Sequence, residues 1–303
     1  MKLSVPLYYK SFKCIADRCR HSCCIGWEID VDSATMEKYR TLNEGYGKDI
    51  IDSIEGDEPH FRLCEDERCP HLDKRGLCNI ISNLGEGYLC NICRAHPRFY
   101  NDTKNGKEAG LGMACEEAAR IILSSDDYDK MTEIEEFCPS EEKYPHDFDA
   151  VSLREKIYSI LAKDIPYTER LSEIEEEFKI SPSALSDEEW KSTLSSLEYL
   201  HEEHKELFSC YSSDRATPER AEDHLRRALA YFIYRHSSAA EIEEDFRASI
   251  GFSLFCERLL ASVIKEKGAF DLESVCDLAR IISEEIEYST DNTEVLKEEF
   301  YFI

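Results

Sequence analysis

The spacing of apolar residues changes near residue 140. After that point apolar residues recur at intervals of three and four, as on one face of a helix, and glycine almost disappears. This pattern predicts helices over 149–163, 166–178, 239–266 and 271–287. We therefore expect residues 141–303 to form an acidic, α-helical C-terminal region.

Side chains that cap helices strengthen this interpretation. Ser186 followed by Glu189 has the spacing of a capping box, in which each side chain binds the other residue's backbone N–H. Thr217 before Pro218 predicts an N-cap with proline at the first helical position. Asp271 is a suitable N-cap for the last predicted helix.

Residues 1–140 are less regular, and turn-forming glycines are frequent among them. Trp27 to Val31 alternates in polarity and predicts a short strand, after which Asp32 or Ser33 caps a helix. Residues 114–123 also show a helical pattern, and 140–150 are the expected connector. The predicted fold is mainly α, with a cysteine-rich metal-binding N-terminal region of little regular structure packed on an α-helical C-terminal region.

The charge of the chain excludes one class of partner. Its net charge is −27, and 17 basic against 20 acidic residues before position 121 leave almost all of the excess to the rest. Nucleic acid binding requires a basic surface and is not expected. No apolar run is long enough to span a membrane. An acidic surface could attract a lysine-bearing protein as partner, but on charge alone a solvated exterior is the simpler explanation.

Nine of the fourteen cysteines fall between Cys14 and Cys93, and this clustering predicts a metal site. Closely spaced thiolates are the ligands of zinc and of iron–sulfur clusters. A disulfide framework is the alternative, but it belongs to oxidising compartments and to small secreted domains. The N-terminal sequence lacks the apolar core of a signal peptide, so we expect a cytoplasmic protein with reduced thiols.

Spacing alone distinguishes some of these cysteines from others. Cys90 and Cys93 form a CxxC pair, the most ligand-like pair of the second group. The three cysteines of the C-terminal half, Cys210, Cys256 and Cys276, lie on predicted helical stripes and are expected to be buried core thiols.

Several short motifs resemble the flagellin lysine-N-methylase (FliB) family, within a wider group of cysteine-cluster proteins. They cover both halves of the chain, and the cysteine blocks are specific through their combined order. The motifs are Phe12-Lys13-Cys14, Cys19, Ser22-Cys23-Cys24-Ile25-Gly26-Trp27, Cys69-Pro70-His71-Leu72, Gly76-Leu77-Cys78-Asn79-Ile80, Cys93-Arg94-Ala95-His96-Pro97-Arg98, Ala114-Cys115-Glu116-Glu117-Ala118-Ala119-Arg120, Tyr231-Phe232-Ile233-Tyr234-Arg235-His236 and Ile286-Glu287-Tyr288-Ser289 with Asn292. Glu116 departs from the family pattern, which usually has proline there.

The resemblance implies methyl transfer from S-adenosylmethionine to lysine side chains of flagellin, by a protein that carries a [4Fe-4S] cluster. Another lysine-bearing protein could replace flagellin, and zinc is the alternative metal. The resemblance supports Cys93 but not Cys90, and we follow it. The expected metal ligands are Cys14, Cys19, Cys23, Cys24, Cys69, Cys78, Cys93 and Cys115. Eight thiols exceed the four that one such cluster needs, so some are structural or a second site exists.

Roles beyond the metal follow less directly. Tyr234 and His236 are candidates for deprotonating the substrate lysine, although helix packing explains His236 as well. Arg94 and Arg98 could contact the cofactor or balance the charge of a thiolate-bound cluster. The glycines Gly110 and Gly112 precede a predicted helix and could receive a ligand carboxylate, or form an ordinary turn.

Two other function classes remain open. A non-catalytic cysteine-cluster protein would use its metal to stabilise the fold, and a redox module would use a cluster to carry electrons. No glycine-rich loop of a Rossmann-like methyltransferase and no CxxxCxxC loop are present. The sequence therefore gives no recognisable site for the methyl donor.

Overall fold

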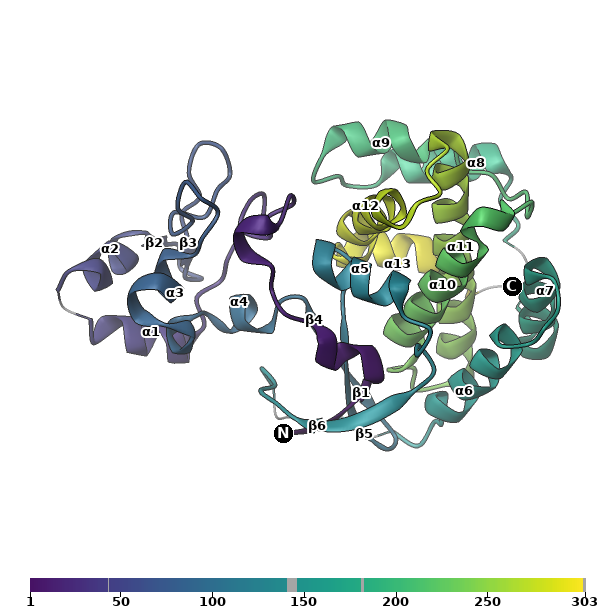
Figure 1. Ribbon diagram of the computed structural model, residues 1–303, viewed down its shortest axis with the longest axis horizontal. Coiled ribbons are helices and arrows are strands. Elements are labelled where there is room, and N and C mark those ends of the chain that lie inside the picture. Colours follow the sequence, from purple (N-terminus) through teal and green to yellow (C-terminus); the bar gives the residue numbers. More distant parts are fainter. Residues whose placement is uncertain (43, 141–145, 181–182, 302–303) are drawn as a thin grey trace. The chain divides into compact units, whose positions relative to one another are not determined.

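The chain forms two compact units. The computed structural model describes residues 1–42, 44–140, 146–180 and 183–301. The smaller unit comprises Lys13–His96 and Phe137–Ser140, and the larger unit comprises the remaining described residues (Figure 1).

The division between the two units does not fall at residue 140, where the sequence predicted it. Residues 1–12 and 97–136 join the helices of the larger unit, because they supply a sheet and a helix that share its core. Part of the predicted connector, 141–145, lies outside the described residues.

A four-stranded sheet in the larger unit was not predicted. Its order is β4 (Arg98–Thr103), β5 (Gly106–Leu111), β1 (Lys2–Pro6) and β6 (Met131–Glu135). β1 runs parallel to β5 and antiparallel to β6, while β4 and β5 form a hairpin. Gly106 closes that hairpin with a φ of 127°, which favours glycine. The sheet thus joins three segments that are far apart in sequence.

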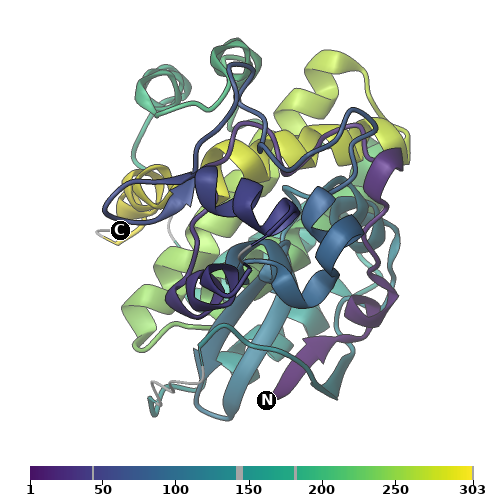
Figure 2. The same ribbon diagram turned by 90° about the vertical axis from the view of Figure 1, so that its left-hand side faces the viewer.

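Helices make up most of the larger unit, which confirms the mainly α prediction. Figure 1 shows α10 and α11 side by side, and Figure 2 shows the chain turned by 90° about the vertical axis. The helices are α5 (Glu116–Ser124), α6 (Ala150–Leu161), α7 (Tyr167–Phe178), α8 (Asp187–Ser196), α9 (Glu202–Phe208), α10 (Glu222–Ser237), α11 (Glu243–Lys267), α12 (Leu272–Ile282) and α13 (Thr290–Glu298). A π-helix, Ser283–Glu287, follows α12, and 3-10 turns occupy Leu7–Ser11 and Glu219–Ala221.

In the larger unit, two predicted caps are confirmed and one is wrong. Ser186 and Glu189 form the complete capping box of α8, and Asp271 accepts the N–H of Ser274 at the start of α12. Thr217 does not cap a helix: its hydroxyl donates to the carbonyl of Arg215. Pro218 instead precedes a 3-10 turn, and α10 begins only after that turn.

The smaller unit contains short helices joined by irregular segments. They are α1 (Ser33–Arg40), α2 (Tyr46–Asp52), α3 (Asn79–Leu84) and α4 (Asn91–Ala95), with two-residue strands β2 (Ile54–Glu55) and β3 (His60–Phe61) and 3-10 turns at Ala16–Arg18 and Glu86–Tyr88. The strand predicted at Trp27–Val31 is reduced to one bridge between Asp30 and His60. Asp32 caps α1 as predicted, and its second oxygen accepts the N–H of Asn91 at the start of α4 (2.8 Å).

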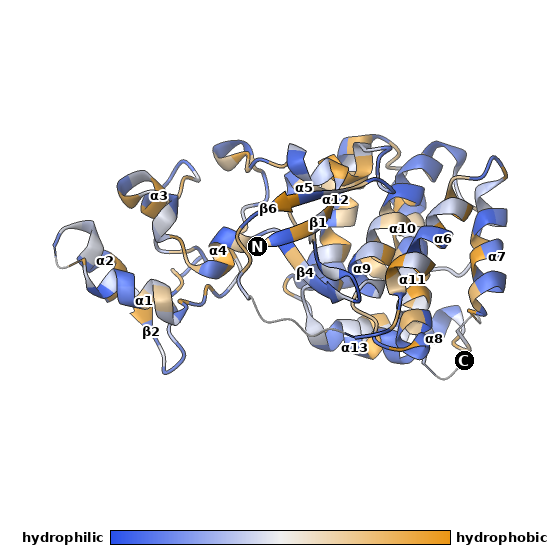
Figure 3. Cartoon of the chain, turned by 90° about the horizontal axis from the view of Figure 1, so that it is seen from below, coloured by the Kyte–Doolittle hydropathy of each residue, from blue (hydrophilic) through white to orange (hydrophobic). Residues whose placement is uncertain are grey.

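Each unit has its own apolar core. The core of the larger unit is extensive, and amphipathic helices such as α7 show both hydrophobic and hydrophilic residues along their length (Figure 3). Among its described residues, the apolar core of the smaller unit contains eight buried residues, two of which are Cys69 and Cys90. Among the described residues, no helix combines the length and the apolar character needed to cross a bilayer.

Candidate functional site

Backbone pairing brings three cysteine-bearing segments of the smaller unit together. The N–H of Cys69 donates to the carbonyl of Cys24 (2.8 Å), beside a bridge between Ile25 and Arg68. A second bridge pairs Leu72 with Cys78. Residues distant in sequence are therefore adjacent before any metal is considered.

Five thiols of the smaller unit form a group that we call the thiol cluster: Cys24, Cys69, Cys78, Cys90 and Cys93. All five lie in or against the apolar core of this unit. Cys69 and Cys90 are buried, and the other three are half-buried. Each lies close enough to others of the group to influence their ionisation.

Ionisation differs between the thiols. The hydrogen bond between Cys90 and Cys93 lowers the pKa of Cys90 and raises the pKa of Cys93, so one thiol of the pair ionises first. A hydrogen bond with Cys23 lowers the pKa of Cys24 to about 7, against the opposing effect of burial. Burial raises the pKa of Cys69 to about 12, and the nearby thiols add to this effect. Neighbouring thiolates repel one another, and this repulsion raises their pKa values. A bound cation would attract the thiolates and lower those pKa values, because the thiolate is the form that binds metal.

Two further side chains support the thiol cluster. The hydroxyl of Tyr39 donates to the carbonyl of Tyr88 (2.6 Å) and lies 3.6 Å from Cys90 Sγ. His71 lies 2.7 Å from the Tyr46 hydroxyl through Nδ1 and 2.9 Å from the Ser53 hydroxyl through Nε2. Burial lowers the pKa of His71 to about 4, so its ring is neutral. Because both ring nitrogens have partners, His71 positions the Cys69 segment rather than binding a metal.

The structure places Cys90 beside the predicted ligand Cys93, although the resemblance supported only Cys93. Cys90 is fully buried, and the CxxC spacing was the signal that could have identified it. Cys14, Cys19 and Cys23 lie in the smaller unit, but among the described residues its apolar core does not include them.

Cys115 lies in the larger unit, at the N-cap of α5. The eight predicted ligands are therefore divided between the units, and the complete ligand set remains a prediction.

The two predicted arginines have other contacts. The guanidinium of Arg94 stacks 3.9 Å from the ring of Phe137, within the smaller unit. Arg98 belongs to the larger unit, where it donates to the Tyr9 hydroxyl (2.8 Å) and pairs with Glu136 (3.1 Å). Through these contacts Arg98 has a structural role: it connects β4 to the segment after β1.

The larger unit contains a second group of functional candidates. His236, in the last turn of α10, places Nε2 2.7 Å from Oε1 of Glu287 on the π-helix. Arg235 lies 3.4 Å from the same carboxylate. His236, Arg235 and Glu287 line a cavity of about 560 Å³ that also includes Lys297 and Phe99.

Charge in this cavity favours a neutral histidine beside an ionised carboxylate. Burial lowers the pKa of His236, although Glu287 acts in the opposite direction. Burial opposes the ionisation of Glu287, but Arg235 and His236 outweigh it and lower the pKa of Glu287. A neutral imidazole facing a carboxylate donates from Nε2, which leaves Nδ1 as the basic nitrogen.

Tyr234 and the two glycines are explained by packing. The Tyr234 hydroxyl donates to the carbonyl of Ala109 (2.9 Å), and its ring is 2% exposed. A Cβ at Gly110 would lie 2.3 Å from the ring of Phe99, and one at Gly112 would lie 2.5 Å from the Tyr288 hydroxyl. Close approach of side chains to the backbone, at Gly110 in β5 and at Gly112 just after it, thus requires both glycines.

Another group of possible ligand atoms lies in the larger unit. His204, Glu284 and Glu285 offer atoms within 4.8 Å of one another, a proximity that no three cysteines reach in the described part of the chain. Glu285, however, accepts the N–H of Leu200 (2.7 Å), and Glu284 pairs with Arg280 (2.5 Å). These bonds give the carboxylates a structural role, since they connect the π-helix to the segment before α9.

Comparison with known proteins supports the predicted resemblance. A protein named lysine-N-methylase from Salmonella typhimurium is 30% identical over 130 residues, and one from Salmonella choleraesuis matches equally. These residues are 40% of this chain and 32% of each relative. The flagellar biosynthetic protein FliU of Salmonella muenchen is 28% identical over 130 residues, 77% of its length. No family model and no solved structure matches the chain.

Proposed function

We propose, from the premise that this chain is a relative of the lysine-N-methylases, that it transfers methyl groups to lysine side chains of a protein. The observation that carries the proposal is the similarity over 130 residues to proteins of that name. The chain spans about a third of the length of those two relatives. Flagellin is the proposed substrate, because a third relative is named for flagellar biosynthesis.

A thiolate-bound metal fits the smaller unit. The thiol cluster supplies more than the four thiols that a [4Fe-4S] cluster requires, in an apolar setting. Thiolates on a single zinc at Zn–S of about 2.3 Å are separated by roughly 3.8 Å. Both zinc and a [4Fe-4S] cluster use four ligands of this kind, and we propose the cluster because the family resemblance implies it. Such a cluster would hold the short helices of this unit together.

In the larger unit, His236 is the proposed base. A lysine ammonium must lose a proton before its nitrogen can attack a methyl group, and the neutral His236 can accept that proton at Nδ1. Glu287 holds the ring through Nε2 and stabilises the imidazolium that forms. S-adenosylmethionine supplies the electrophilic methyl group when bound, and its thioether is the leaving group. Carboxylates such as Glu294 and Glu298, in the same cavity wall, would attract the lysine ammonium.

The test is methyl transfer to flagellin in vitro. The chain, purified without oxygen, is incubated with S-adenosylmethionine and flagellin, and methylated lysines are counted by mass spectrometry. We expect methylated lysines, and a loss of about a hundredfold or more in rate for His236→Gln. His224→Gln, on the same helix, is the matched control. Raising the pH should partly restore His236→Gln, because solvent then deprotonates the lysine.

Two results would contradict the proposal. Absence of methyl transfer by metal-loaded wild-type protein, with flagellin and with other lysine-bearing proteins, would reject the activity. Equal rates for His236→Gln and His224→Gln would reject the role of His236 and leave the activity intact.

A non-catalytic, metal-stabilised protein is the second candidate. The burial of Cys69 and Cys90 within a core of eight residues favours it, because a metal there would stabilise the fold without any reaction. Stoichiometric metal together with no binding of the methyl donor would support this alternative.

A further inference from the structure

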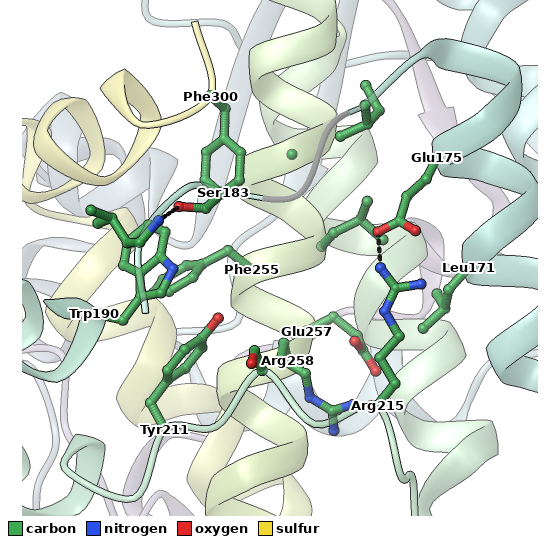
Figure 4. A pocket seen from close by; sticks show the side chains of 15 residues that line it. Leu171, Glu175, Ser183, Trp190, Tyr211, Arg215, Phe255, Glu257, Arg258 and Phe300 are labelled. Atoms are coloured by element: carbon green, nitrogen blue, oxygen red, sulfur yellow. Dashed lines mark hydrogen bonds and ion pairs between the residues drawn. The ribbon is translucent and has the colours of Figure 1, made fainter. Parts of the chain in front are cut away.

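The larger unit contains a second cavity, of about 220 Å³, that shares no lining residue with the cavity of His236 among the described residues (Figure 4). It lies among α7, α8, α11 and the segment that follows α9. Aromatic side chains form one part of its wall, and charged side chains form another. Such a wall is typical of a site for a small molecule, in which apolar surface binds the body and a few polar groups fix its orientation.

Flat apolar surface makes up the aromatic part of the wall. The rings of Trp190 and Phe255 lie 4.3 Å apart between centroids, and Phe300 stacks 6.0 Å from Trp190. Tyr211 lies 5.1 Å from Phe255, and the side chain of Leu254 continues the apolar surface. Because aromatic rings attract one another in stacked and edge-to-face arrangements, this wall favours a ligand that carries an aromatic ring.

Arg258, on α11, gives the cavity a buried cation. Its side chain lines the wall, and the residue is 8% exposed. Within the described part of the chain, its Nε and Nη1 atoms have no hydrogen-bond partner. A buried guanidinium with unused donors is costly, because burial removes the water that would otherwise hydrate it. A carboxylate in the cavity would accept hydrogen bonds from this guanidinium and balance its charge.

The charges around the cavity favour a ligand with one negative charge. Arg215 is already paired with Glu175, as Figure 4 shows. Glu257 is 1% exposed and accepts the Tyr167 hydroxyl (3.2 Å), and burial raises its pKa to about 7. Near neutral pH this carboxyl is therefore only partly ionised, and it leaves the charge of Arg258 incompletely balanced. A phosphate dianion would be repelled by Glu175 and Glu257, whereas a neutral ligand would leave Arg258 unpaired.

We infer that this cavity binds a small aromatic monocarboxylate, with its carboxylate at Arg258 and its ring against Trp190 and Phe255. The volume is smaller than the roughly 300 Å³ or more of a typical drug-sized site, so the ligand is a single ring on a short acid chain. Such binding needs neither the metal nor the methyl donor. It therefore forms a second ligand site, apart from the proposed methyl transfer.

NMR titration of the chain tests this site with three probes. The first, 3-phenylpropionate, carries both the ring and the carboxylate. The second, 3-phenylpropan-1-ol, keeps the ring without the charge, and the third, propionate, keeps the charge without the ring. We expect 3-phenylpropionate to bind and the other two to bind at least about tenfold more weakly, because each lacks one of the two contacts. This comparison uses the wild type alone, so no substitution can disturb it.

Substitution of Arg258 locates the carboxylate. Arg258→Met should weaken binding of 3-phenylpropionate at least about tenfold, because the charge-assisted hydrogen bonds are lost. Arg226→Met, on α10, is the matched control, since Arg226 pairs with Asp223 (2.9 Å) and does not line the cavity. We expect this control to bind as the wild type does. Saturating 3-phenylpropionate should raise the melting temperature of the wild type and of the control, but not that of Arg258→Met.

Thermal unfolding without ligand separates binding from a merely structural role. Arg258→Met should melt no lower than the wild type, because it removes a buried charge whose donors are unused. A large drop in melting temperature would show that Arg258 supports the fold, and the comparison of the three probes on the wild type would then decide alone.

Each binding outcome decides the inference. Equal binding of 3-phenylpropionate and 3-phenylpropan-1-ol, unchanged affinity of Arg258→Met, or no binding to the wild type would overturn it. Displacement of 3-phenylpropionate by S-adenosylhomocysteine would also overturn it, because the cavity would then belong to the methyl donor. Failure of methyl transfer, with 3-phenylpropionate bound as expected, would reject the proposed function and leave this site standing.

Discussion

The two units of this chain are stabilised in different ways. The larger unit buries a continuous apolar core between helices of 7 to 25 residues. In the smaller unit the α-helices have 5 to 8 residues, and two cysteines belong to a core of eight. Short helices are marginal alone, and small cores rarely supply enough stabilisation without a cross-link. We therefore propose that the larger unit is stabilised by apolar burial, whereas the smaller unit also needs a metal bound by its thiols.

Metal removal should affect the two units most unequally. With chelator under reducing conditions, amides of α1, α3 and α4 should exchange rapidly, while those of α10 and α11 stay protected. Binding of a structural metal is worth on the order of 10 kcal/mol in small metal-stabilised domains. Hydrogen exchange with mass spectrometry measures both units in one sample. Equal protection in the smaller unit before and after removal would contradict the comparison.

Within the larger unit, Glu108→Ala should lower the free energy of unfolding more than any other substitution discussed below. Both Glu108 oxygens accept from Arg154, at 2.7 and 2.8 Å, and Arg154 is 1% exposed. Removing the carboxylate leaves a buried cation, at a cost of about 3–5 kcal/mol in the free energy of unfolding. Glu133→Ala, on the same sheet, breaks an exposed pair with Lys2 and should cost less than about 1 kcal/mol. Similar values in urea unfolding would be inconsistent with this account.

Glu257→Gln should change how stability depends on pH. Burial raises the pKa of Glu257 from its ordinary 4.5 to about 7. Between these values the folded protein retains a proton that the unfolded chain has lost, so stability falls as pH rises. Above about pH 7 the ionised wild type is destabilised by roughly 3 kcal/mol, and glutamine removes this penalty. Unfolding at several pH values should show the variant's advantage growing up to neutrality, unlike exposed Glu241→Gln. A stability difference between the variant and the wild type that stays constant with pH would contradict the raised pKa of Glu257.

The smallest effect is expected at the capping box of α8. Ser186→Ala removes the side chain that accepts the N–H of Glu189, which should cost about 1 kcal/mol. Thr217→Ala is the comparison, because Thr217 caps no helix and donates to Arg215 instead. Thermal melts should rank Ser186→Ala below Thr217→Ala. The reverse order would show that the capping box contributes little here.

Local signals in the sequence predicted the helices well. Asp32, Ser186 and Asp271 cap helices as expected, since a cap depends on residues only three positions apart. The sheet escaped prediction because β5 has two glycines and two charged residues, and because Ser4 pairs with Glu108 across more than a hundred positions. For the same reason the sequence did not predict that His236 would face Glu287, which lies 51 positions away. Such contacts join residues far apart in the sequence, and the periodicity of apolar residues carries no information about which distant segments pair.

The most direct test of the account is the metal content of the chain purified without oxygen. Iron, sulfide and zinc would be quantified in the wild type, Cys90→Ser and Cys256→Ser. Cys90 belongs to the thiol cluster, whereas Cys256 is fully buried in the core of the larger unit. We predict about four irons with matching sulfide in the wild type and Cys256→Ser, and a marked loss in Cys90→Ser. Full iron in Cys90→Ser, or a wild type without metal, would contradict the claim that the thiol cluster binds it.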